Sequence, residues 1–122
     1  MLIRNYPFLI IRPGDIARPY LPVTIINPDS NKQIKVYALI DTGADECAFP
    51  ASFAPLLGHN LLAGQPKKVS TGNGVTIAYS HITRIIIEEF STQDVLIDFM
   101  PNLYFPLLGV ISFLCNFILT VD

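Results

Sequence analysis

The 122-residue chain has no tryptophan, only two cysteines and only two histidines, and its formal net charge is −2. Because no run of Lys or Arg is present, binding to nucleic acid is not expected. Cys47 and Cys115 lack the spacing of metal ligands, so we expect free thiols in a reducing compartment such as the cytoplasm. His59 and His81 have no cysteine or carboxylate at ligand spacing, which predicts surface or turn residues and no metal site.

Charge is also missing from the C-terminal part of the chain. No charged residue lies between Asp98 and Asp122, and residues 105–121 are almost wholly apolar. A membrane tail is therefore an alternative interpretation of this segment. Prolines, a glycine and polar residues interrupt it, and no Lys or Arg flanks it, so we expect no membrane partner.

The length fits one domain over residues 1–122, and no repeat, linker or low-complexity tract is visible. Turn-forming residues separate short apolar segments, which predicts a mostly-β fold. Strands are expected over residues 20–26, 34–40, 82–89, 94–99 and 117–121, with a further hairpin over residues 67–79. Short helices are expected over residues 50–57 and 110–116. This periodicity alone does not distinguish a barrel from a sandwich.

One apolar run leads a single carboxylate into a sharp turn. Residues 36–40 read Val-Tyr-Ala-Leu-Ile, and Asp41-Thr42-Gly43-Ala44 follows, with Gly43 free to adopt the turn conformation. A carboxylate at the end of a buried strand is costly unless it is hydrogen-bonded or shares a proton. The chain has no second Asp-Thr-Gly or Asp-Ser-Gly triplet. By itself the triplet is also compatible with a simple turn in which Asp41 caps the next segment.

Three segments resemble the retropepsin-type aspartic proteases of bacteria and viruses. Residues 38–45 (Ala-Leu-Ile-Asp-Thr-Gly-Ala-Asp) resemble the active-site signature. The glycine-bearing hairpin at residues 69–75 lies where the family has its mobile flap, and Leu107-Leu108-Gly109 resembles the second hydrophobic element, whose loop encloses the active-site turn. The resemblance implies a closed acid-protease barrel with one or two short helices, which supplies half of a two-fold active site.

The same resemblance implies a homodimer that hydrolyses peptide or protein substrates without a cofactor. One signature on a short chain is half of an active site, so the second carboxylate would be Asp41 of the partner subunit. In this chemistry, two carboxylates share one proton, and together they activate water and protonate the leaving amine. A module that keeps the fold for dimerisation or peptide binding, without activity, is the alternative function.

Roles for single residues also follow from the resemblance. Asp41 would be the catalytic carboxylate, and Thr42 would hydrogen-bond across the dimer axis. Contacts to the substrate are implied for Gly43, Ala44, Asp45, Gly72, Asn73, Gly74 and Leu107, and Gly109 would belong to the loop around the turn. The expected apolar pocket walls are Ala44, Val75, Leu103, Pro106 and Leu107. Thr42 and the 72–74 segment are also compatible with ordinary turns.

Val110 is a departure from the family pattern. Retroviral enzymes commonly carry Arg at this position, where it pairs with the carboxylate at the position of Asp45. We therefore expect Asp45 to stay solvated or to pair with Arg18 of the partner subunit.

Overall fold

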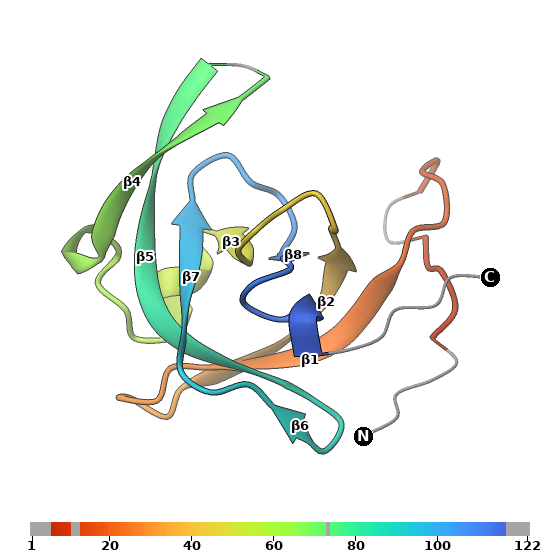
Figure 1. Ribbon diagram of the computed structural model, residues 1–122, viewed down its shortest axis with the longest axis horizontal. Coiled ribbons are helices and arrows are strands. Elements are labelled where there is room, and N and C mark those ends of the chain that lie inside the picture. Colours follow the sequence, from red (N-terminus) through yellow and green to blue (C-terminus); the bar gives the residue numbers. More distant parts are fainter. Residues whose placement is uncertain (1–5, 11–12, 73, 117–122) are drawn as a thin grey trace.

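The computed structural model describes residues 6–10, 13–72 and 74–116, and within them eight strands form one mixed sheet (Figure 1). The strands are β1 (Tyr20–Ile26), β2 (Gln33–Ile40), β3 (Ala48–Pro50), β4 (Gln65–Thr71), β5 (Gly74–Ile87), β6 (Phe90–Ser91), β7 (Val95–Met100) and β8 (Leu107–Leu108). The helical elements are short, namely α1 (Phe53–Leu56) and the 3₁₀ helices η1 (Leu61–Ala63) and η2 (Leu114–Asn116). The predicted mostly-β fold with short helices is confirmed.

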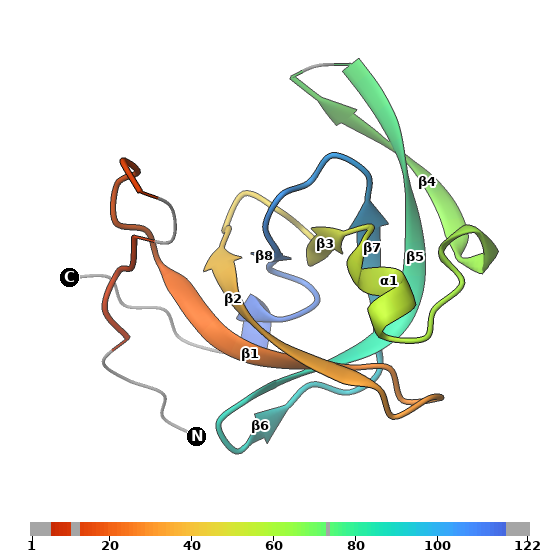
Figure 2. The ribbon, with the colours of Figure 1, turned by 180° about the vertical axis from the view of Figure 1, so that it is seen from behind.

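The sheet closes on itself through β5, a strand of 14 residues. Neighbouring strands follow the order β1-β2-β8-β3-β7-β5-β4, and β1 also pairs with β5, where Ile25 lies opposite Ile85. The ring of strands is uneven, because β4 and the first part of β5 extend beyond it as a hairpin (Figures 1 and 2). The β2–β3 and β7–β8 connections lie at the end of the barrel from which this hairpin projects.

Several elements differ from their expected ranges. The strands expected to end at residue 79 and to begin at residue 82 are one strand, because Ser80 and His81 both pair with β7 and do not interrupt the ladder. The helix expected over residues 50–57 is limited to α1, because Pro50 pairs with β7 as part of β3. The helix expected over residues 110–116 is a turn followed by η2. The strand expected over residues 117–121 lies outside the described residues.

Apolar side chains from the whole length of the sheet fill the barrel. The largest fully buried side chains include Phe49, Phe99 and Phe113, and the rings of Phe49 and Phe99 pack edge to face with centroids 6.0 Å apart. Burying a side chain of this size contributes about 1.5–3 kcal/mol. Leu108 and Phe113 show that the apolar C-terminal part supplies core residues. In the described part of the chain, no helix is long and apolar enough to cross a membrane.

Two histidines that are distant in sequence stack in the structure. The ring centroids of His59 and His81 are 4.5 Å apart, and both rings pack on Phe99. Nδ1 of His59 accepts a hydrogen bond from the side-chain amide of Asn27 (3.3 Å), and its Nε2 lies 3.2 Å from Oγ1 of Thr83. His81 is a half-buried residue of strand β5, so it does not lie in a turn.

Acid is expected to weaken the fold through His59. Burial and the neighbouring His81 lower the pKa of His59 below its ordinary value of 6.5, although Asp29 opposes them. The unfolded chain therefore takes up a proton at His59 at a higher pH than the folded chain. The contribution of His59 to the free energy of unfolding is fully present above about pH 6.5 and is lost as the pH falls below that value. Urea unfolding at neutral and mildly acidic pH should show a smaller pH dependence in His59→Gln than in the wild type. Equal pH dependence in the two proteins would contradict this role.

Candidate active site

A sharp turn follows β2 and carries Asp41. The backbone N–H of Asp41 donates to the carbonyl of Leu108 in β8 (3.1 Å), and the N–H of Ala44 donates to the carbonyl of Asp41 (3.2 Å). The N–H of Gly43 donates to Oδ1 of Asp41 at 3.1 Å, which orients the carboxylate. Asp41 is half-buried, whereas Thr42 and Gly43 are exposed. Within the described part of the chain, the second carboxylate oxygen of Asp41 has no hydrogen-bond partner.

The segment around β8 encloses this turn. Strand β8 runs parallel to the end of β2 and pairs with it. Immediately after β8, the N–H of Val110 donates to the carbonyl of Ala44 (2.8 Å), and the N–H of Ile111 donates to the carbonyl of Asp45 (2.6 Å). Leu107, the first residue of β8, is half-buried. The structure therefore brings the two hydrophobic elements of the sequence together and fixes the backbone of the turn from both ends.

Gly109 makes this close approach possible. A Cβ atom at Gly109 would overlap the carbonyl group of Glu46 and would lie 2.9 Å from the backbone nitrogen of Cys47. The N–H of Gly109 points at Sγ of Cys47 (3.3 Å), and the N–H of Cys47 donates to Oγ of Ser112 (3.3 Å). Burial raises the pKa of Cys47 to about 12, so its thiol is neutral and packs as a small apolar group. The packing roles of Cys47 and Ser112 have no signal in the sequence.

Asp45 presents its side chain to solvent at the end of the turn. No ion pair to Asp45 is present among the described residues. Arg18, the expected partner from the second subunit, pairs within its own chain with Asp15, at 3.2 Å between Nη2 and Oδ1 and 3.3 Å between Nε and Oδ2. Arg18 could pair with Asp45 of the partner subunit only if its ion pair with Asp15 opened.

The predicted flap corresponds to the hairpin of β4 and β5. Thr71 lies opposite Gly74, whose φ of +115° is open to glycine but strained for other residues. Gly72 is exposed at the tip, and Asn73 lies outside the described residues. Val75 is 68% exposed and pairs with Ser70, on the opposite face of the hairpin from the paired Val69 and Thr76.

A polar cluster joins this hairpin to the segment after the turn. Nζ of Lys67 in β4 lies 3.0 Å from Oδ2 of Asp98 in β7 and 3.5 Å from Oε2 of Glu46. Ser80 in β5 donates its hydroxyl to Oδ1 of Asp98 at 2.8 Å. None of the residues predicted for the site from the sequence belongs to this cluster. Its one available signal was Asp98, a charged residue inside the apolar strand β7.

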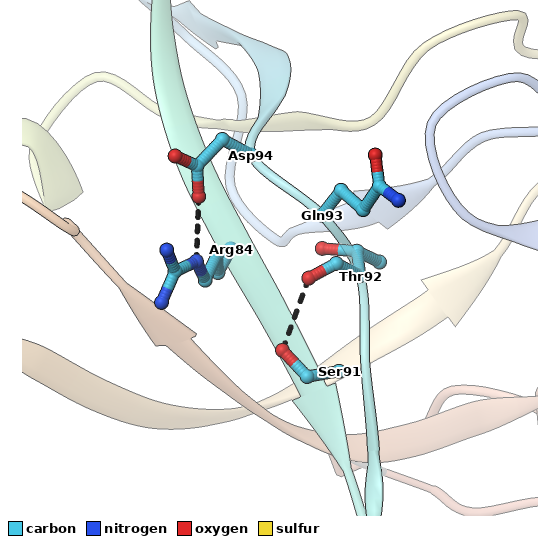
Figure 3. Close-up of a pocket in the computed structure, with 5 residues that line it drawn as sticks. All are labelled: Arg84, Ser91, Thr92, Gln93 and Asp94. Carbon is cyan, nitrogen blue, oxygen red and sulfur yellow. Dashed lines mark hydrogen bonds and ion pairs between the residues drawn. The ribbon is translucent and has the colours of Figure 1, made fainter.

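A surface hollow of about 490 Å³ has no lining residue from the Asp41 turn, and Figure 3 shows the residues that line it. It is lined by Arg84, Ser91, Thr92, Gln93 and Asp94, beside β6. Nε of Arg84 donates to Asp94 at 2.5 Å, and Ser91 donates to the carbonyl of Thr92 at 3.0 Å, so these polar groups satisfy one another. None of the residues of the predicted site lines this hollow.

Comparisons with known proteins agree with this geometry. Residues 26–115 match the family model described as gag-polyprotein putative aspartyl protease. Among solved structures, a retropepsin-like aspartic protease from Rickettsia conorii aligns with a TM-score of 0.70 and 23% identity, over 98% of this chain and 95% of that one. EIAV protease complexed with the inhibitor HBY-793 aligns with a TM-score of 0.54 and 17% identity, over 83% of this chain and 88% of that one. No curated protein sequence gives a significant match.

The two structural likenesses identify the fold as that of the retropepsins. The family model spans most of the chain and includes both the Asp41-Thr42-Gly43 turn and the Leu107-Leu108-Gly109 element that encloses it. Sequence, topology and family match thus agree, and the chain belongs to the retropepsin-type, gag-polyprotein aspartyl protease family.

Proposed function

We propose that this protein is an aspartic endopeptidase whose site forms between Asp41 and Asp41 of the partner subunit. The observation that carries the proposal is the half-buried carboxylate at the turn. Gly43 holds one oxygen of Asp41, while the other has no hydrogen-bond partner in the described part of the chain. A single chain carries one such turn, and the two-fold axis of a homodimer places the second carboxylate beside it.

The paired carboxylates would supply both the base and the acid that peptide hydrolysis needs. Two like charges at short range cannot both ionise readily, so the pair keeps one proton. The ionised carboxylate removes a proton from water as that water attacks the peptide carbonyl, and the protonated one donates its proton to the amide nitrogen as the C–N bond breaks. The hydrogen bond from the N–H of Gly43 holds each carboxylate in place. Thr42 would hydrogen-bond across the two-fold axis of the dimer.

An extended peptide would lie between the turn and the hairpin β4–β5. Main-chain hydrogen bonds would hold it as an added strand, with the Gly43 carbonyl as one acceptor. The carbonyl of Asp45 already accepts from Ile111, so the N–H and side chain of Asp45 are the groups it offers to a substrate. Ala44 and Leu107 supply apolar walls, which favours apolar residues beside the cleaved bond. The tip at residues 72–74 would close over the peptide and exclude water.

Sedimentation of the purified chain, run beside cleavage of a peptide library, tests the proposal. We expect a dimer at micromolar concentration and cleavage that declines with dilution as the dimer dissociates. A monomer that cleaves peptides at every concentration would overturn the shared site. A stable dimer that cleaves no peptide in the library would favour the binding or dimerisation module instead.

A further inference from the structure

The register of the sheet places the Lys67 cluster beside the proposed site. Asp98 pairs with Ala48 in β3 and with Ser80 in β5, and Ala48 pairs in turn with Leu107 in β8. Directly paired residues project their side chains from the same face of a sheet. Asp98 and Ser80 therefore share a face with Leu107, and Lys67 reaches over that face from the hairpin.

Lys67 also stands at the point where the hairpin leaves the barrel. It lies opposite Ala78, and the pairing of β5 with β7 begins one residue later, at Tyr79. From residue 68 to residue 78, the described strands of the hairpin pair only with each other. Contacts at Lys67 are therefore placed to set the angle between the projecting hairpin and the body of the molecule.

Burial of the Asp98 carboxylate favours this contact. The side chain of Asp98 is 8% exposed, whereas that of Lys67 is 47% exposed. Burying a carboxylate without hydrogen-bond partners costs free energy. The ammonium of Lys67 and the hydroxyl of Ser80 are the partners of the Asp98 carboxylate. The hydrogen bond to Asp98 raises the pKa of Lys67, so the ammonium remains charged across the neutral range.

We infer that Lys67 is a positioning residue, which fixes the hairpin β4–β5 over the Asp41 turn by tying it to Asp98 and to Glu46. Glu46 follows Asp45 directly, and its carbonyl group packs against Gly109. One side chain thereby connects the hairpin β4–β5, strand β7 and the segment that follows the Asp41 turn. The effect on turnover rests on the proposed function, whereas the effect on the hairpin does not.

Hydrogen exchange of the ligand-free protein tests this inference with a double variant, Lys67→Met with Asp98→Asn. Met keeps the apolar stem of Lys67, and Asn keeps an acceptor for Ser80, so no lone charge is left buried. We expect amides of residues 68–71 and 74–78 to exchange about tenfold faster, with no change in β1 and β2. If the protein cleaves peptides, kcat/KM should fall about tenfold through KM, because the substrate must then order the hairpin.

Lys68→Met is the matched control. Lys68 is the next residue of β4, is exposed, and has no ion pair among the described residues, so the same loss of charge there should leave exchange unchanged. Faster exchange throughout the sheet would show a general structural role and overturn the inference, as would hairpin exchange equal to that of Lys68→Met. Hydrogen exchange is measured without substrate. The experiment therefore tests the role of Lys67 even if the protein cleaves no peptide.

Discussion

Replacing Asp41 with asparagine is expected to lower kcat/KM by about 10³-fold while the fold and the dimer persist. The change removes the group that exchanges a proton with water and with the leaving amine. The amide oxygen of the asparagine can still accept a hydrogen bond from the N–H of Gly43. In the wild type this N–H lies 3.1 Å from Oδ1 of Asp41. Initial rates on a cleaved peptide, with sedimentation and thermal unfolding of the same samples, measure the effect.

Asp29→Asn is the matched control for this variant. Asp29 precedes Ser30 and Asn31 in a polar turn, which is the sequence nearest to a second Asp-Ser-Gly triplet. The backbone N–H of Asp29 donates a hydrogen bond to Oδ1 of Asn27 at 3.0 Å, which is a local contact within this turn. The control should retain wild-type rates. Near wild-type activity in Asp41→Asn would rule out Asp41 as a catalytic residue.

Adding one methyl group at Gly109 is expected to destabilise the protein by about 3 kcal/mol and to abolish activity with it. The new Cβ would overlap the backbone of Glu46, and backbone cannot yield as the end of a flexible side chain does. The turn and β8 would have to separate, which breaks the hydrogen bonds from Val110 to Ala44 and from Ile111 to Asp45. Urea unfolding of Gly109→Ala measures the loss.

Gly72→Ala separates this packing effect from the general cost of replacing a glycine. Among the described residues, no atom outside the chain neighbours lies within 4 Å of a Cβ placed at Gly72. The free energy of unfolding of Gly72→Ala should therefore stay within about 0.5 kcal/mol of the wild type. If Gly109→Ala were as stable as Gly72→Ala, the close contact between the turn and β8 would not exist in solution.

The parts of the site that are local in sequence could be predicted. The apolar run before Asp41, the glycine in the turn and the Asn-Gly step of the hairpin each act over a few residues, so their patterns indicate strand, turn and hairpin directly. The Leu107-Leu108-Gly109 element was placed beside the turn by family resemblance, and its pairing with β2 agrees with that placement.

Contacts set by register could not be predicted in the same way. Lys67 and Asp98 are 31 positions apart and His59 and His81 meet across separate elements, so no local pattern signals either pair. The continuity of β5 was missed because Ser80 and His81 are not strong strand formers, and the pairing with β7 overrides that preference. Such contacts depend on which strands become neighbours, and this is decided by the whole barrel.

Mixing active and inactive chains shows whether two chains share one site. Wild-type protein is combined with increasing amounts of Asp41→Asn at a fixed wild-type concentration, under conditions in which subunits exchange. If each site needs Asp41 from both chains, activity per wild-type chain should fall to about half at equal amounts and to about a tenth at ninefold excess. Activity that depends only on the amount of wild-type protein, whatever the excess of the variant, would contradict the shared site.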